Sequence, residues 1–215
     1  MLLICAAVLE ELQPLIVSGD FKQEGENLFK HHSRSVLIAA LGVGLVDFAS
    51  GLQSVLCDFK IDQALLTGTC GVYPEALVEY PLGTLVVPEK VSLGDLSEVE
   101  KSGYFPAPVI QSCILDKELF CDLLPNLGGH CLTLATITAD DQLAVKIADH
   151  YRVEFEQMEA YAFARLCQIN QVRGTALFAV VNQVGSKGHA QWRANADQGA
   201  IMVADLIRGK FNLTE

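Results

Sequence analysis

The segment Glu154-Phe155-Glu156-Gln157-Met158-Glu159-Ala160-Tyr161-Ala162 marks the change from strand to helix around which the chain is organised. Apolar residues alternate with others over 151–155, as in a strand, and they return at helical spacing over 160–167. Glu159 is therefore predicted to lie where a strand passes into a helix. In an open α/β sheet, ligands bind at such positions, outside the carboxyl ends of the strands.

Two interpretations of Glu159 follow from this position. Its carboxylate can accept two hydrogen bonds from a vicinal diol, while the thioether of Met158 lies against an apolar sugar face. Alternatively, Glu159 is an acid of the first helical turn, stabilised there by the helix dipole. The spacing by itself favours the second interpretation.

Composition predicts one α/β domain over residues 1–215. Hydrophobic residues make up 51% of the chain and charged residues 19%, so the core is extensive and helices should cover both faces of the sheet. Strand and helix patterns alternate. The strands are expected at 2–8, 35–40, 63–66, 82–91, 131–138 and 176–181, and the main helices at 9–16, 44–55, 115–124, 141–149 and 199–210. This order predicts a three-layer α/β/α fold with a central mixed, largely parallel sheet.

Charge and cysteine usage exclude several classes of function. The net charge of −11, without a basic stripe, argues against a nucleic acid or an anionic membrane as partner. The seven cysteines form no Cys-x-x-Cys pair and mostly lie in apolar runs, as expected for buried, reduced thiols in a cytoplasmic protein. Residues 1–8 are too short for a membrane span and lack the basic start of a signal peptide.

Four loops that follow strands carry unusual residues, and together they are predicted to line one pocket. They are the loop with Glu10 and Glu11 and the loops at 67–71, 157–159 and 182–192. None offers the spaced histidine, cysteine and aspartate ligands of a metal site, so no metal is expected. The five histidines fall mostly in polar segments or at helix ends, where solvated side chains are expected.

The four loops, in this order, resemble those of the nucleoside phosphorylase and nucleosidase superfamily over nearly the whole chain. Residues 6–12 (AAVLEEL) are similar to the first strand and loop of bacterial methylthioadenosine/S-adenosylhomocysteine nucleosidases, whose catalytic acid falls on Glu11. Residues 156–160 (EQMEA) are similar to their ribose-binding element. The resemblance implies a nucleoside phosphorylase-like fold, a small-molecule purine nucleoside as ligand, no cofactor and a homodimer, for which the loop 94–108 is a candidate contact.

Two segments resemble the futalosine hydrolase branch of this superfamily. They are residues 68–74 (GTCGVYP) and 181–185 (VNQVG), the latter with Trp192 downstream. Asn182 stands where the methylthioadenosine enzymes have an aspartate. An aspartate can protonate the five-membered ring of adenine, whereas the Asn182 amide can only donate hydrogen bonds to that ring or to a 6-oxo group. Asn182 therefore favours a 6-oxopurine, although an asparagine amide can also pair with adenine.

The resemblance also implies roles for the remaining site residues. Glu11 would act as general base on water while Glu159 holds the ribose hydroxyls. Water is preferred to phosphate as nucleophile because none of the six arginines lies in the first loop or in the loop 157–159. The expected contacts to the substrate are Thr69, Cys70, Gly71, Ile137, Thr138, Gln157 and Met158. For Ile137 and Thr138, ordinary strand packing is nearly as well supported.

The implied reaction is hydrolysis of futalosine to hypoxanthine and dehypoxanthine futalosine, a step of menaquinone biosynthesis. Two alternatives stay open: a methylthioadenosine/S-adenosylhomocysteine nucleosidase, and a non-catalytic nucleoside-binding protein on the same fold. A basic island with Lys187, His189 and Arg193 could attract the carboxylate on the aromatic tail of futalosine. A solvated loop is the simpler interpretation of that island.

Overall fold

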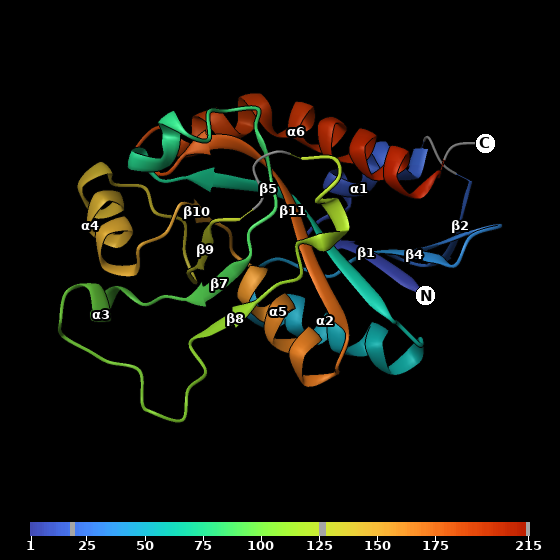
Figure 1. Ribbon diagram of the computed structural model, residues 1–215, viewed down its shortest axis with the longest axis horizontal. Coiled ribbons are helices and arrows are strands. Elements are labelled where there is room, and N and C mark those ends of the chain that lie inside the picture. Colours follow the sequence, from blue (N-terminus) through green and yellow to red (C-terminus); the bar gives the residue numbers. More distant parts are fainter. Residues whose placement is uncertain (18–19, 125–127, 214–215) are drawn as a thin grey trace.

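In the structure, a computed structural model, one sheet of 11 strands runs through the described residues, 1–17, 20–124 and 128–213 (Figure 1). The strands are β1 (Leu2–Ala6), β2 (Phe21–Gly25), β3 (Leu28–His31), β4 (Val36–Ala40), β5 (Gln63–Val72), β6 (Leu85–Val86), β7 (Lys90–Leu93), β8 (Ser112–Ile114), β9 (His130–Thr133), β10 (Phe155–Glu156) and β11 (Arg173–Gln183). The α-helices are α1 (Leu9–Val17), α2 (Gly44–Asp58), α3 (Leu96–Val99), α4 (Asp141–Tyr151), α5 (Ala160–Ile169) and α6 (Gly188–Phe211), and the 3-10 helices are η1 (Pro74–Val78) and η2 (Glu118–Phe120).

The sheet is mixed and parallel at its centre, as predicted. The strand order is β2-β3-β4-β1-β5-β10-β9-β7-β8, and β11 pairs with the other edge of β5. The pairs of β1 with β4, β1 with β5 and β5 with β11 are all parallel. The carboxyl ends of β1, β5 and β11 therefore point to the same end of the sheet, which is where a ligand site is expected.

Helices cover both faces of the sheet, so the predicted three layers are confirmed. Helices α1 and α6 lie together on one face, and α2 and α5 lie on the other (Figure 1). Phe48 and Leu52 of α2 and Phe163 of α5 are fully buried in one hydrophobic cluster. Leu12 of α1 and Ile207 of α6 are fully buried in the second. The predicted helical spacing of these apolar residues matches the faces that the helices bury.

Strand β5 overturns one predicted loop. Residues 67–71 continue the strand to Val72, with β11 along one edge and β10 pairing with its last two residues on the other. The small residues of this stretch are compatible with a tight turn or with close approach of another group, and here they let neighbouring groups approach the strand closely. Only Gly68 of this stretch has a left-handed backbone, with φ of +142°.

The loop predicted over 182–192 is also shorter than expected. Asn182 and Gln183 end β11, and α6 begins at Gly188, eleven residues before the predicted helix over 199–210. The Gln191 side chain accepts a hydrogen bond from the Gln183 amide at 2.8 Å, which ties the start of the helix to the end of the strand. This first part of α6 lacks an apolar stripe because it borders a cavity instead of the core.

Three other elements differ from their predictions. The strand expected over 82–91 is divided into β6 and β7 around Pro88, which has no amide hydrogen for a ladder. The helix expected over 115–124 is only η2, because Asp116 accepts a hydrogen bond from the Glu118 amide at 2.8 Å and forms a local turn. The strand expected over 131–138 ends at Thr133.

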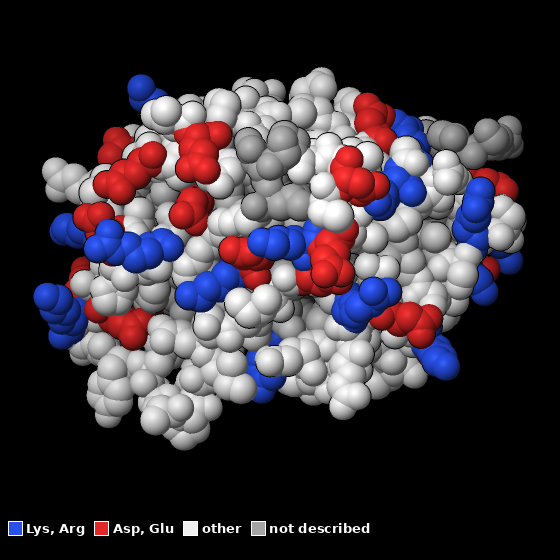
Figure 2. Space-filling model, in the orientation of Figure 1, with Lys and Arg blue, Asp and Glu red and all other residues white. Residues whose placement is uncertain are grey.

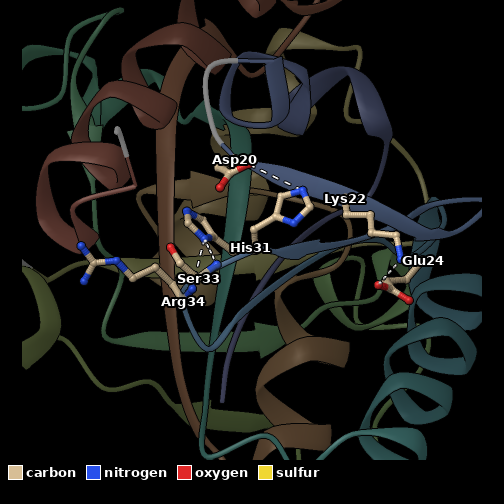
Figure 3. Close-up of polar contacts among 7 residues, drawn as sticks. Asp20, Lys22, Glu24, His31, Ser33 and Arg34 are labelled. Atoms are coloured by element: carbon tan, nitrogen blue, oxygen red, sulfur yellow. Dashed lines mark hydrogen bonds and ion pairs between the residues drawn. The ribbon is translucent and has the colours of Figure 1, made fainter.

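The β2–β3 hairpin at the sheet edge corrects the prediction that the histidines are solvated. His31 is only 6% exposed. Its Nδ1 accepts hydrogen bonds from the backbone amides of Ser33 and Arg34, at 3.2 Å and 3.1 Å (Figure 3). The ring thus organises the turn that leads into β4.

The surface carries charges of both signs, and most of the thiols are buried. Acidic and basic side chains are interspersed on the face shown in Figure 2. Among the described residues, no helix combines the length and apolar character needed to cross a bilayer. All seven cysteines are unpaired, and five are buried, but Cys57 and Cys121 are exposed, contrary to the prediction of buried thiols.

Candidate active site

A cavity of about 650 Å³ opens beside the ends of β5, β10 and β11, between the segment that follows β1 and the first half of α6. Each of the four segments predicted to form a pocket contributes to its wall. The predicted site residues found in the wall are Glu11, Thr69, Cys70, Gly71, Ile137, Gln157, Met158, Glu159 and Asn182. Thr138 is not in the wall and lies buried behind it.

Glu11 stands in the first turn of α1 and is fixed by β5. Its Oε1 accepts hydrogen bonds from the Thr69 backbone amide at 3.0 Å and from the Thr69 hydroxyl at 3.2 Å. The same hydroxyl accepts a hydrogen bond from the Trp192 indole nitrogen at 3.3 Å. Burial raises the pKa of Glu11 from 4.5 to about 7; the Thr69 amide opposes this rise, and the charge of Glu159 adds to it. A carboxyl with this pKa can exchange a proton near neutral pH, as a general base must.

Gly68 makes the position of Glu11 possible. A Cβ on Gly68 would lie 2.5 Å from Glu11 Oε1, and its φ of +142° strains any residue with a side chain. We expect Gly68→Ala to displace the carboxylate and to lower kcat/KM for the hydrolysis that the resemblance implies by about 10- to 100-fold, with a loss of about 1–3 kcal/mol in the free energy of unfolding. Steady-state kinetics and denaturant unfolding measure the two effects.

Gly83 supplies the matched control for this substitution. Its φ is +88°, so alanine is strained there too, but an added Cβ would meet nothing within 4 Å. We expect Gly83→Ala to lose stability and to retain activity. Equal losses of activity in both variants would show that backbone strain, and not displacement of Glu11, causes the defect.

Glu159 lies where β10 passes into α5, as predicted, and it occupies the N-cap position of that helix, but its side chain makes no capping hydrogen bond. Its Oε1 accepts a hydrogen bond from the Gly44 amide at the start of α2, at 2.7 Å, and its Oε2 accepts one from the Gln157 side chain. The Gln157 oxygen in turn accepts from the amides of Glu159 and Ala160, at 2.7 Å and 2.6 Å, and so caps α5. Burial raises the pKa of Glu159, and the hydrogen bonds that its carboxylate accepts from Gly44 and Gln157 oppose the rise.

Asn182 reaches the cavity from the end of β11, opposite Gly71 of β5. One of its amide hydrogens is donated to the Gln183 carbonyl at 3.2 Å. A Cβ on Gly71 would lie 2.9 Å from the Asn182 nitrogen, so glycine at this position keeps the amide accessible. The amide can donate to a ligand but cannot supply a titrating proton.

Glu156 also lines the cavity, and sequence reasoning gave it no role. It is 9% exposed. Its oxygens accept hydrogen bonds from the Tyr73 hydroxyl at 2.7 Å, the Thr138 hydroxyl at 2.6 Å and the Thr138 amide at 3.0 Å. Thr138 therefore holds a wall residue in place. Its strand, β10, has only two residues, and the sequence just before it already carries Arg152 and Glu154, so no local signal marked Glu156.

Of the three basic residues in the island, only His189 lines the cavity. His189 is in the cavity wall and stacks on Trp192, with ring centroids 5.9 Å apart, whereas Lys187 and Arg193 are outside the wall and exposed. Any attraction of a substrate carboxylate from inside the cavity would thus depend on His189, and that role stays a prediction.

The wall is poor in cations and has no grouping suited to a metal. Among its described residues, none is lysine or arginine. Over the described chain, no group of three or more histidine, cysteine, aspartate or glutamate side chains is arranged to hold a metal ion. A second cavity of about 420 Å³ lies beside the first and shares Glu10, Asp197 and Ala200 with it, between α1 and α6.

Known proteins share this architecture. The family model of the phosphorylase superfamily matches residues 21–209. Futalosine hydrolase of Thermus thermophilus is 30% identical over 171 residues, which cover 74% of this chain and 75% of that protein. Among solved structures, 5′-methylthioadenosine/S-adenosylhomocysteine nucleosidase of Helicobacter pylori matches with a TM-score of 0.84 at 15% identity, covering 98% of this chain and 97% of the other. Futalosine hydrolase of Helicobacter pylori matches with a TM-score of 0.83 at 16% identity, over the same shares of the two chains.

The match to the family model extends over most of the chain, and the T. thermophilus relative adds a second match at the level of sequence. The carboxylates Glu11 and Glu159 lie in one cavity on this fold. The protein belongs to the phosphorylase superfamily and is a nucleosidase, that is, a hydrolase of N-glycosidic bonds.

Proposed function

We propose that the protein hydrolyses the N-glycosidic bond of futalosine and releases hypoxanthine and dehypoxanthine futalosine. The observation that carries this proposal is the placement of Glu11 and Glu159 in the wall of one cavity with the Asn182 amide. One carboxylate can handle a proton, the other can hold a diol, and the amide can bind a purine. The sequence relative of T. thermophilus, itself a futalosine hydrolase, supports this substrate.

Glu11 would act on the attacking water. With a pKa of about 7, its carboxylate is partly ionised at neutral pH and takes a proton as water attacks the anomeric carbon. The bond between that carbon and the base nitrogen breaks, and the sugar passes through an oxocarbenium-like state. Thr69 and Trp192 keep the Glu11 side chain oriented during this step.

Glu159 and Asn182 would act on the two parts of the substrate. The Glu159 carboxylate is oriented by Gly44 and Gln157, and its remaining lone pairs can accept hydrogen bonds from the two ribose hydroxyls. Such bonds strengthen as positive charge develops on the sugar. The free amide hydrogen of Asn182 can stabilise the negative charge that develops on the departing base.

Water, and not phosphate, fits this cavity as the nucleophile. A phosphate dianion needs cationic partners, and arginine is the usual one. The described wall has no lysine or arginine and places the acidic Glu11 at the position proposed for the nucleophile. A carboxylate there would repel phosphate but can activate water.

The test compares nucleosides that differ in base and in 5′ substituent. Purified protein is given futalosine, methylthioadenosine, S-adenosylhomocysteine and inosine in phosphate-free buffer, and purine release is followed by chromatography. We expect hypoxanthine from futalosine at the highest kcat/KM. Faster adenine release would assign the chain to the methylthioadenosine enzymes, and no release at all would leave a nucleoside-binding protein.

The one-domain organisation, the homodimer and the cytoplasmic location stay predictions. Light scattering of the purified protein measures the dimer.

A further inference from the structure

Glu156 is a buried carboxylate in the cavity that the proposed chemistry does not use. Its burial is costly unless its oxygens are hydrogen-bonded. Three donors meet them, the Tyr73 hydroxyl and the hydroxyl and amide of Thr138. Among the described residues, none forms an ion pair with it. A carboxylate kept in a cavity wall by neutral donors alone is an oriented acceptor of hydrogen bonds.

The sheet places Glu156 opposite Asn182 across one missing side chain. Glu156 pairs with Gly71 on one edge of β5, and Asn182 pairs with Gly71 on the other. Residues paired across strands project from the same face of a sheet. The two side chains thus arise two strand spacings apart, roughly 9–10 Å. Gly71 adds no side chain between them, and the Asn182 amide and a Val184 methyl group lie close to its Cα hydrogen instead.

That separation suits a purine base with one hydrogen bond at each side. Asn182 can donate to the five-membered ring or to a 6-oxo group, as proposed above. When Asn182 donates to the five-membered ring, the six-membered ring, which carries the nitrogen N1, is directed away from Asn182. In a 6-oxopurine N1 bears a hydrogen and is a donor, whereas in adenine N1 has only a lone pair.

We infer that Glu156 determines the specificity for 6-oxopurine nucleosides by accepting a hydrogen bond from N1–H. Oxygen Oε1 accepts only from the Thr138 amide and so retains a lone pair for this bond. Adenine would place its N1 lone pair against the carboxylate, and neither group could donate. This inference rests on the proposed function, and it assigns to Glu156 the choice of base that Asn182 makes only in part.

The substitution Glu156→Gln tests the inference because it keeps the size of the side chain and exchanges one acceptor for a donor. The substrates are futalosine and its 6-amino analogue, which differ only in the base. We expect kcat/KM for futalosine to fall by about 10- to 100-fold, with kcat/KM for the 6-amino analogue unchanged or raised. Equal losses for both substrates would overturn the inference, because a merely structural role affects both bases alike.

Tyr73→Phe is the matched control, since it removes one donor of the same network and retains the carboxylate. We expect it to change the two kcat/KM values by the same factor. Thermal unfolding of both variants shows whether they are folded. If the wild-type protein releases purine from neither substrate, the proposed function fails. If it does release purine, but the ratio of kcat/KM for futalosine to kcat/KM for the 6-amino analogue is the same in Glu156→Gln as in wild type, only this inference fails.

A measurement on the wild-type protein keeps the inference testable should Glu156→Gln not fold. Hypoxanthine and 1-methylhypoxanthine are compared as inhibitors of hydrolysis, because the methyl group replaces the hydrogen on N1. We expect 1-methylhypoxanthine to inhibit at least about 10-fold more weakly, as a lost hydrogen bond to a charged group requires. Equal inhibition constants would exclude Glu156 as the acceptor for N1–H.

Discussion

Replacing Glu11 with glutamine is expected to lower kcat for nucleoside hydrolysis by about 10²- to 10⁴-fold, the range that general bases contribute. Glutamine has the same shape and its oxygen can still accept from the Thr69 amide, but it cannot take a proton from water. In the wild-type protein, kcat/KM should fall as the pH decreases below about 7, because protonation of Glu11 removes the base. Steady-state kinetics of purine release over pH 5–9 measure both effects. Activity in the variant within about threefold of wild type would exclude Glu11 as the base.

The same substitution, Glu11→Gln, lowers activity but is expected to raise the free energy of unfolding at alkaline pH. Burial raises the pKa of Glu11 in the folded protein from 4.5 to about 7. A group with a raised pKa contributes stability that is fully present below its unfolded pKa and is lost as the pH rises through its folded pKa. The wild-type protein should therefore lose up to about 3 kcal/mol between pH 4.5 and pH 8, relative to Glu11→Gln.

Unfolding in urea at pH 5 and pH 8 measures this difference. The variant should be the more stable protein at pH 8 and close to wild type at pH 5. Glu75→Gln is the control, because Glu75 is exposed and outside the cavity wall. This control substitution should leave the free energy of unfolding unchanged at both pH 5 and pH 8. A difference between Glu11→Gln and wild type that does not depend on pH would mean that Glu11 is not held in a desolvated site.

Glu159 and Met158, which line the cavity, could be predicted as candidate site residues because a local sequence pattern changes at their position. A period of two that becomes a period of 3.6 is visible in the residues themselves. The role proposed for Glu11 rests on resemblance instead. Its pKa is raised by burial and, to a smaller extent, by the charge of Glu159, while the hydrogen bonds from Thr69 of β5 oppose the rise. No feature of the first helix in the sequence reports these tertiary effects.

Tertiary contacts explain what sequence reasoning missed. The position of Glu156 in the cavity wall depends on the register of β10 on β5, and its orientation depends on a hydrogen bond from Thr138, which follows a different strand. Residues 67–71 were mistaken for a loop because small residues serve both tight turns and strands that must let a side chain approach. The polar start of α6 gave no helical pattern because the cavity, and not the core, borders it.

Replacing Glu159 with glutamine is expected to lower kcat/KM by about 10²- to 10³-fold, because two hydrogen bonds from the ribose to a charged acceptor are weakened. The amide group also conflicts with its surroundings. Gly44 donates to one carboxylate oxygen and Gln157 to the other in the wild-type protein, so the glutamine nitrogen would face one of these donors in either orientation of the amide. Kinetics with inosine and with 2′-deoxyinosine isolate the contact to the 2′-hydroxyl.

The comparison uses the ratio of the two kcat/KM values, since the intrinsic reactivity of each nucleoside cancels when the ratio is compared between wild type and variant. If Glu159 binds the 2′-hydroxyl, the preference for inosine over its deoxy analogue should shrink by about 10-fold or more in Glu159→Gln. A glutamate that serves only to connect α2 with α5 would lower both values together and leave the ratio as it is. The ratio therefore separates the two interpretations of Glu159, ribose ligand and helix acid, that its spacing in the chain could not separate.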